Sequence, residues 1–169
     1  MTEFAEGGSL WDLMGGDVDD DQREALDEGT VRMIAEQVIE GLAALHENDI
    51  VHRDIKPQNV LRCDDIWKIA DFGISKLMNN PVTGYTFQGA HTAPWAPPEQ
   101  IQGAAAHPSA DIYAWGRVIV FLLTGRTAID AVGDAPTPWH DLLTSCTSLT
   151  PEQRPDAAAI LDWLRGIGG

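Results

Sequence analysis

The sequence predicts a mainly helical α+β domain, and two kinds of pattern support this prediction. Apolar residues recur at helical spacing in three segments, 30–47, 112–123 and 157–164. Residues 60–70 contain two short apolar stretches around a turn-forming segment, which is typical of a β-hairpin. The chain has 169 residues, enough for one domain with a hydrophobic core. We find no internal repeat or low-complexity linker in it, so one domain is expected.

The first predicted helix covers residues 30–47. Its apolar stripe, which is expected to face the core, consists of Val31, Ile34, Ala35, Val38, Leu42 and Leu45. Thr30 is the predicted N-cap, and the acidic run at 17–21 is predicted to be a loop. His46, close to the end of the helix, is expected to pack against the protein rather than to bind a ligand.

The hairpin and the most apolar helix come next. Residues 60–62 and 66–70 are the predicted strands, and residues 63–65 are the turn. The helix predicted at 112–123 ends before Gly125 and is too short and too interrupted to span a bilayer. We therefore expect it to be the hydrophobic centre of the domain.

The last predicted helix covers residues 157–164. It begins after the pair Pro155-Asp156, because proline is favoured at helix starts. Its inward-facing residues are expected to be Ile160, Leu161 and Leu164.

The most informative segment for function is the run HRDIKPQN at residues 52–59. A hydroxyl that attacks a γ-phosphate needs a carboxylate within hydrogen-bond reach, and Asp54 could orient this hydroxyl and accept its proton. Lys56 follows two residues later and could place a positive charge on the transferring phosphoryl group. The alternative for Lys56 is an ordinary surface lysine.

A second motif, DFG at residues 71–73, follows at the distance that the predicted hairpin sets. Magnesium prefers hard oxygen ligands. The amide oxygen of Asn59 and the carboxylate of Asp71 could hold this ion against the phosphates of a nucleotide. The two motifs together indicate phosphoryl transfer.

These motifs resemble the catalytic loop and the metal-binding motif of protein kinases. Lys56, two residues after Asp54, matches the serine/threonine branch of that family. The resemblance implies a kinase-like C-terminal lobe, an α+β fold that is mainly helical with short β-hairpins, with residues 100–169 as its helical subdomain. It also implies ATP and Mg²⁺ as cofactors and Ser/Thr hydroxyls of proteins as substrates.

Downstream segments support the resemblance. Residues 92–99, TAPWAPPE, look like the end of a kinase activation segment at 71–99, with Pro-Pro-Glu where the family usually has Ala-Pro-Glu. Asp111 matches the aspartate at the start of the central helix, which would accept amide hydrogens of the catalytic loop. Arg154 matches the arginine that would form a buried ion pair with Glu99.

Residues 1–10 resemble the hinge that links the two lobes of a kinase. In that register Thr2 would be the gatekeeper residue, and the backbone of Glu3 and Ala5 would hydrogen-bond adenine. Leu61 would form the floor under the adenine ring, although it could equally be a core leucine.

Residues 74–91 would be the activation loop. A phosphate on Thr83 or Thr86 could pair with Arg53 and order this loop, whereas the alternative is an unmodified loop. Thr92 would contact the proposed base and the neighbouring lysine and help to select a Ser/Thr hydroxyl. Its alternative is a simple turn residue.

The resemblance covers the hinge and the larger C-terminal lobe, and nothing in the chain matches the smaller N-terminal lobe. The glycine-rich loop, the strand lysine and its glutamate partner cannot be assigned to any residue here. The segment 126–138 is also short, so a docking helix of the family is reduced or missing. We expect weak or no activity from this chain alone, with a partner that supplies or replaces the N-terminal lobe as one possibility.

Three alternatives remain open. The chain could be a truncated gene product, a non-catalytic kinase-like module that binds or regulates a partner, or a small-molecule phosphotransferase. The intact set of Asp54, Asn59 and Asp71 argues against the non-catalytic module. Lys56 and the downstream segments argue for protein substrates.

Composition bears on partners and location. The net charge is −15, with 17 Asp, 9 Glu and only 3 Lys, which disfavours nucleic acids and anionic membranes as partners. Cys63 and Cys146 lie far apart without a second metal-type pair, so reduced thiols are expected. The N-terminus carries no signal-like apolar run, and we expect a cytoplasmic protein without a membrane segment.

Overall fold

The computed structural model describes residues 7–70, 76–77 and 94–167. Its helices are α1 (Leu10–Leu13), α2 (Glu28–Glu47), α3 (Pro98–Ile101), α4 (Pro108–Thr124), α5 (Trp139–Cys146) and α6 (Ala157–Gly166). Its strands are β1 (Ile50–Val51), β2 (Val60–Cys63), β3 (Ile66–Ile69) and β4 (Lys76–Leu77). Short 3₁₀ turns occur at Asp20–Gln22, Pro57–Asn59, Ile129–Asp134 and Pro151–Gln153. The described chain is therefore mainly helical with few strands, as the sequence predicts.

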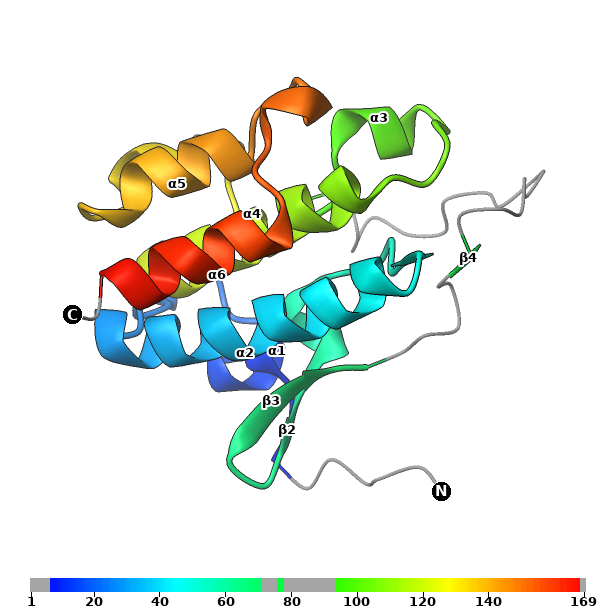
Figure 1. The fold of residues 1–169 in the computed structure, drawn as a ribbon. Helices are drawn as coiled ribbons and strands as arrows, with labels where there is room; N and C mark the ends of the chain where they lie inside the picture. Colours follow the sequence, from blue (N-terminus) through cyan, green and yellow to red (C-terminus); the bar gives the residue numbers. More distant parts are fainter. Residues whose placement is uncertain (1–6, 71–75, 78–93, 168–169) are drawn as a thin grey trace.

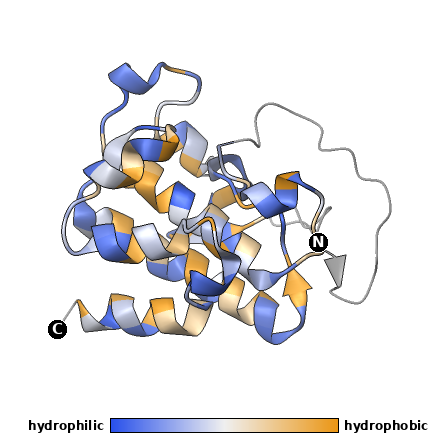
Figure 2. Ribbon diagram, turned by 90° about the horizontal axis from the view of Figure 1, so that it is seen from above, coloured by the Kyte–Doolittle hydropathy of each residue, from blue (hydrophilic) through white to orange (hydrophobic). Residues whose placement is uncertain are grey.

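Helix α4 is the hydrophobic centre of the structure, which confirms the prediction for this segment. Every residue from Ser109 to Leu123 is buried. Helices α2 and α5 both contact α4, and α6 lies along α2 (Figure 1). Hydrophobic and hydrophilic residues alternate along the helices in Figure 2, as expected when each outer helix buries one face. Among the described residues, no helix combines the length and apolarity needed to cross a bilayer.

Helix α2 begins earlier than the sequence suggests, and the predicted N-cap is wrong. The helix starts at Glu28, and Asp27 is its N-cap. The carboxylate of Asp27 accepts hydrogen bonds from the backbone N–H of Thr30 at 3.0 Å and from its hydroxyl at 2.6 Å. Thr30 is therefore in the first turn, because a cap side chain reaches the free amide three residues ahead.

Helix α4 also begins earlier than predicted, at Pro108 instead of Ile112. Proline is suited to the first helical position, and the His107 side chain caps the helix by accepting from the Ser109 amide. The predicted end is correct: Gly125 has φ of 71°. A Cβ at Gly125 would lie 2.9 Å from the backbone oxygen of Arg23, so glycine is required for two reasons.

The predicted hairpin is formed by β2 and β3, which pair antiparallel with Val60 opposite Ile69. Asp64 adopts φ of 54° in the turn, a conformation that aspartate tolerates better than most residues. Strand β3 packs on α2. A second antiparallel pair, β1 with β4, is only two residues long, too short for a sequence pattern to reveal.

The C-terminal helix follows the prediction. Asp156 caps α6 by accepting from the Ala159 amide at 2.8 Å. Ile160 and Leu164 are buried, and Leu161 packs partly against the core.

Both cysteines are free thiols, as expected. Cys63 is half-buried, whereas Cys146 at the end of α5 is fully buried. Burial raises the pKa of the Cys146 thiol to about 12. A Cβ at Gly116 would lie 2.8 Å from the Cys146 Cβ, so this glycine allows α4 and α5 to approach closely.

Candidate active site

The candidate site lies on the segment that connects β1 to β2. Strand β1 ends at Val51, and the 3₁₀ turn Pro57–Asn59 leads directly into β2. The functional run 52–59 is therefore held between two strands. Both ends of the run are buried, at His52 and Asn59.

Asp111, near the start of α4, holds the first residues of the segment 52–59 in place. Its carboxylate accepts the backbone N–H groups of His52 at 2.8 Å and Arg53 at 2.7 Å. It also lies 2.9 Å from Nε2 of His46. Arg53 has φ of 69°, and a left-handed residue at this point lets two successive amides converge on one anion. His46 is thus a structural residue that packs against Asp111, as the sequence suggests.

The structure brings Asp54, Lys56 and Asn59 together. Lys56 Nζ lies 3.2 Å from Asp54 Oδ2. Asn59 Nδ2 donates to Asp54 Oδ2 at 3.0 Å and to the Asp54 backbone oxygen at 2.9 Å. The Asp54 residue is only 8% exposed, so these contacts hold its carboxylate in a largely buried position.

These contacts fix which way the Asn59 amide points. Both Asp54 oxygens can only accept hydrogen bonds, so the Asn59 amide nitrogen must face them. The Asn59 oxygen is then available as a hard ligand for a cation such as Mg²⁺. The donor chemistry at Asn59 thus fits magnesium. In the described part of the chain no three His, Cys, Asp or Glu side chains are grouped so that they could hold a metal ion, and Asp71 lies outside this part.

His52 links the loop to the strand that leads toward Asp71. The Asp54 amide donates to His52 Nδ1 at 3.2 Å, so this nitrogen carries no proton. The other ring nitrogen therefore donates to the Ala70 backbone oxygen, 3.0 Å away. The Ala70 amide in turn donates to the Asn59 backbone oxygen at 2.8 Å. These bonds fix the position of the chain just before Asp71.

Arg154 and Glu99 form an ion pair at the start of α4. The two guanidinium nitrogens lie 2.5 and 3.0 Å from the Glu99 oxygens, and the Arg154 side chain is fully buried. Arg154 also donates to the backbone oxygens of Ser109 and Ser148. Burial opposes ionisation of Glu99, but hydrogen bonds and charge from Arg154 outweigh it and lower the Glu99 pKa. The pair joins α3 to the start of α4 and the turn before α6.

The sequence did not reveal two buried residues, Gln100 and Arg117, whose side chains donate hydrogen bonds to backbone oxygens of segments around the site. Gln100 is buried, and its amide nitrogen donates to the Arg53 backbone oxygen at 2.7 Å. Arg117 is 1% exposed inside α4. The only sequence sign for Arg117 is a charged residue inside an apolar run.

Arg117 is surrounded by backbone carbonyls. Its guanidinium donates to Pro94 at 3.1 Å, Thr127 at 2.7 Å, Ala128 at 2.8 Å and Ile129 at 3.1 Å. Burial lowers the pKa of this group from its ordinary value. Since five N–H donors meet four carbonyl oxygens, the charge is solvated by the protein backbone itself.

Leu61 lies in β2, opposite Lys68, and is half-buried. Its role as the adenine floor stays a prediction. The remaining predicted site residues lie outside the described residues and are Glu3, Ala5, Asp71 and Thr92. The same holds for Thr2 and for the possible phosphorylation sites Thr83 and Thr86.

Comparison with known proteins gives the family. Residues 1–140 match the protein kinase domain. The chain belongs to the protein kinase family. It is 36% identical to the serine/threonine-protein kinase PknL of Mycobacterium tuberculosis, over 95% of this chain and 44% of that protein. It is also 36% identical to the serine/threonine-protein kinase PrkC of Bacillus subtilis, over 77% of this chain and 19% of that protein.

A third kinase relative is the probable serine/threonine-protein kinase PkwA of Thermomonospora curvata. It is 29% identical to this chain over 83% of the chain and 21% of that protein. The chain thus spans less than half the length of each of these three relatives. All three carry the serine/threonine-protein kinase name, which agrees with the resemblance found in the sequence.

Proposed function

We propose that this chain forms the catalytic side of a serine/threonine protein kinase, which transfers the γ-phosphoryl group of ATP to a protein hydroxyl. The observation that carries the proposal is the cluster of Asp54, Lys56 and Asn59. The Lys56 ammonium lies 3.2 Å and the Asn59 amide nitrogen 3.0 Å from the same Asp54 carboxylate oxygen, in a hydrogen-bonded loop. Membership of the kinase family supports the same function.

In the proposed reaction, Asp54 accepts the proton of the attacking serine or threonine hydroxyl. The hydroxyl oxygen forms a bond to the γ-phosphorus, and the bond from that phosphorus to the bridging oxygen breaks, leaving its electron pair on ADP. Lys56 Nζ, paired with Asp54, brings a positive charge to the position where phosphoryl charge is transferred. Asn59 Nδ2 holds the Asp54 carboxylate in place for this proton transfer.

The Asn59 oxygen and the Asp71 carboxylate would hold Mg²⁺. When bound, this ion neutralises phosphate charge and orients the γ-phosphoryl group. The remaining proposed roles follow the family resemblance. Adenine would be held by the backbone of Glu3 and Ala5 above Leu61. Arg53 would bind a phosphate of the activation segment 71–99. Thr92 would contact Asp54 and Lys56 and help to select a Ser/Thr hydroxyl.

The domain division is part of the proposal. Residues 1–10 would be the hinge, 52–59 the catalytic loop, and 100–169 the helical subdomain. Because no residue of the chain can be assigned to the glycine-rich loop or to the strand lysine and its glutamate partner, we expect weak or no transfer from the isolated chain. Positioning and charge from both sides of the cleft are needed for full rate. A protein that binds the chain and supplies the missing side would raise the rate.

Calorimetric titration with Mg-ATP tests the proposal. The wild-type chain should bind Mg-ATP, and Asp71→Ala should remove the binding because a metal ligand is lost. Asp65→Ala is the matched control, since Asp65 lies in the β2–β3 turn with its side chain 97% exposed and carries the same charge. No binding by the wild-type chain, or equal loss in both variants, would contradict the proposal and favour a non-catalytic binding module.

A further inference from the structure

Gln100, in the short helix α3, is a buried polar residue outside the cluster of Asp54, Lys56 and Asn59. Its side-chain nitrogen Nε2 donates a hydrogen bond to the backbone oxygen of Arg53 at 2.7 Å. Arg53 directly precedes the proposed base Asp54. The Gln100 amide therefore reaches the catalytic loop immediately in front of the residue that would accept the hydroxyl proton.

The oxygen that Gln100 contacts belongs to the peptide unit between Arg53 and Asp54. A peptide unit is planar, so contacts on its two opposite edges fix its orientation. Gln100 holds the oxygen edge, and His52 Nδ1 accepts the Asp54 N–H on the other edge at 3.2 Å. If the plane turned over, the carbonyl oxygen would face the lone pair of His52 and the N–H would face the donor of Gln100. Both hydrogen bonds would then be lost.

Local backbone preference does not hold this part of the loop. Arg53 has φ of 69°, in the left-handed region that residues with a side chain avoid, so contacts from outside the loop must maintain it. The Asp111 carboxylate accepts the Arg53 N–H at 2.7 Å. Arg53 is thus held by α4 through its nitrogen and by α3 through its oxygen.

The orientation of this peptide unit matters because of how the Asp54 side chain is used. Lys56 Nζ and Asn59 Nδ2, the side-chain donors that the described residues bring to this carboxylate, both meet Oδ2. In the proposed reaction Oδ1 is therefore the oxygen that accepts the hydroxyl proton. The position of Oδ1 depends on where the backbone directs the Asp54 Cβ. Misplacement slows the reaction, because proton transfer needs heavy atoms about 2.6–3.2 Å apart.

Helix α3 is firmly attached to the rest of the protein, so it can hold the loop in place. Glu99, next to Gln100, forms the ion pair with Arg154. Arg154 also donates to the Ser109 backbone oxygen of α4 at 3.0 Å, two residues before Asp111. A closed ring of contacts therefore links the catalytic loop, α4, Arg154 and α3.

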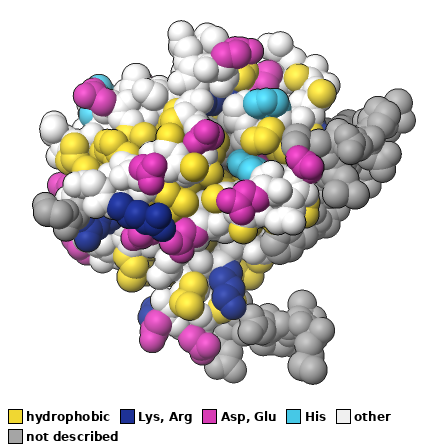
Figure 3. Space-filling view, viewed as in Figure 1, with side chains coloured by type: hydrophobic (Ala, Val, Ile, Leu, Met, Phe, Trp, Pro, Cys, Tyr) yellow, Lys and Arg dark blue, Asp and Glu magenta, His cyan; other side chains and the backbone are white. Residues whose placement is uncertain are grey.

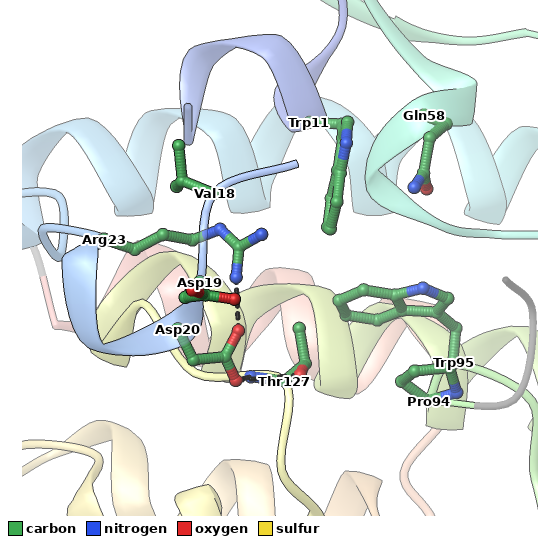
Figure 4. A pocket seen from close by; sticks show the side chains of 9 residues that line it. All are labelled: Trp11, Val18, Asp19, Asp20, Arg23, Gln58, Pro94, Trp95 and Thr127. Atoms are coloured by element: carbon green, nitrogen blue, oxygen red, sulfur yellow. Dashed lines mark hydrogen bonds and ion pairs between the residues drawn. The ribbon is translucent and has the colours of Figure 1, made fainter. Parts of the chain in front are cut away.

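The segment that leads into α3 also lies beside the loop at a second place, but less tightly. Trp95 and Gln58 both line a cavity of about 380 Å³, and Figure 4 shows their side chains on facing walls. Where a cavity separates two walls, few atom contacts fix their spacing. The hydrogen bond of Gln100 is the tighter of these two approaches.

We propose that Gln100 is a positioning residue of the transfer reaction. It fixes the peptide unit in front of Asp54 and so directs the Asp54 carboxylate toward the attacking hydroxyl. The inference rests on the proposed kinase function and adds a residue to it. Gln100 acts through the backbone of the loop and not by contact with the reacting groups.

Amide hydrogen exchange followed by NMR tests this role on the full chain. Gln100→Met keeps a long unbranched side chain but removes the donor, so the Asp54 amide should exchange about tenfold faster than in wild type. The amide of Ile119, in the buried centre of α4, reports global unfolding and should change less. Gln102→Met is the matched control, because Gln102 is exposed. Equal acceleration of the Asp54 and Ile119 amides, or an unchanged Asp54 amide, would overturn the proposal.

A second pair of variants separates the lost donor from a change of shape. Gln100→Glu has nearly the wild-type shape, yet its ionised carboxylate cannot donate to the Arg53 oxygen. Acidic side chains are already spread over the face shown in Figure 3, where basic ones occupy few places, so Gln102→Glu controls for the added charge.

Protonation of the new carboxyl group restores a donor. The excess exchange of the Asp54 amide in Gln100→Glu over Gln102→Glu should therefore shrink as the pH falls toward about 5, where a buried glutamate gains a proton. Comparison of the two variants at each pH removes the titration of all other groups. An excess that stays the same at neutral and acid pH would contradict the proposed hydrogen bond.

Single-turnover transfer from Mg-ATP to a serine peptide, at high protein concentration, gives the functional readout. Gln100→Met should slow transfer about tenfold and leave the Mg-ATP affinity within about twofold, since no proposed nucleotide ligand is changed. Equal transfer rates in wild type and Gln100→Met would support the kinase function and overturn the positioning role. Failure of the wild-type chain to bind Mg-ATP would contradict the kinase function, and the exchange measurements would still decide whether Gln100 fixes the loop.

Discussion

Asp111 and Arg117 lie six residues apart on α4 and are equally buried, at 1% exposure, yet each organises a different part of the molecule. The Asp111 carboxylate accepts hydrogen bonds from two backbone amides of the proposed catalytic loop and also contacts His46 of α2. The Arg117 guanidinium donates hydrogen bonds to the backbone carbonyls of Pro94 and of residues 127–129. One helix therefore holds the proposed catalytic loop with an anion, and Pro94 and residues 127–129 with a cation.

The comparison shows that a buried charge does not need a strongly charged partner. Backbone dipoles can satisfy it when several of them point at the same charged group, as four carbonyls do at Arg117. A carboxylate has two oxygens, which can accept hydrogen bonds from two neighbouring amides of one tight loop. A guanidinium with five donors can connect two segments that are distant in sequence, which is what Arg117 does.

The largest effect is expected at Asp111. Asp111→Asn replaces an oxygen that accepts amide hydrogens by an NH₂ group that faces them, so the free energy of unfolding should fall by about 3 kcal/mol. Urea unfolding followed by circular dichroism measures this. Asp162→Asn, at an exposed position of α6, is the control and should change little. Equal stability of the Asp111 variant would mean that the loop amides find other acceptors.

Arg117→Met is expected to cost about 2 kcal/mol of unfolding free energy, because it leaves buried carbonyls without donors. The loss should be smaller than at Asp111, since carbonyls in the 127–129 turn can reorient toward water. Arg117→Lys should lie between, because one ammonium cannot reach both segments. The comparison would fail if the methionine variant were as stable as wild type.

The smallest effect on stability is expected at Glu99, because its side chain is 25% exposed and solvent screens the ion pair with Arg154. Its pKa in the folded protein is lowered below the ordinary value of 4.5. The pair therefore contributes stability above that pH, and the contribution is lost as the pH falls through the folded pKa. Glu99→Gln should cost about 1 kcal/mol at neutral pH, and the difference from wild type should shrink below pH 4.5.

Urea unfolding of both proteins at neutral and acid pH measures this difference directly. Comparing the two proteins at each pH removes the effect of the other carboxylates, which titrate in both. A difference that stays constant across the acid range would show that the ion pair contributes nothing beyond packing.

The sequence predicted the parts of the structure that have a local pattern. Periodicity located α2, α4 and α6, and the apolar stretches around Asp64 located the hairpin. The motif at 52–59 pointed to Asp54, Lys56 and Asn59, which do lie together. The motifs at 52–59 and 71–73 also resemble those of the protein kinase family, and their order and spacing are specific enough to indicate this family without an alignment.

The missed features depend on contacts that leave no local pattern. The helix starts at Glu28 and Pro108 were misplaced because several polar residues compete for a cap, and only the folded chain shows which one reaches the free amide. Arg117 interacts with carbonyls, which every residue has, so its sequence neighbours say nothing about its partners. Trp11, Gln58 and Trp95 line one cavity, and their separation along the chain hides this proximity.

The close contact between α4 and α5 at Gly116 and Cys146 also allows the opening of this contact to be measured by the alkylation rate of Cys146. Alkylating reagents attack thiolates, and Cys146 is both fully buried and held protonated by its pKa of about 12. The half-exposed Cys63 should react in the folded state, so mass spectrometry would show one fast adduct and one slow one. The rate of the slow adduct reports how often these two helices separate, in the unaltered protein and without a fluorescent label.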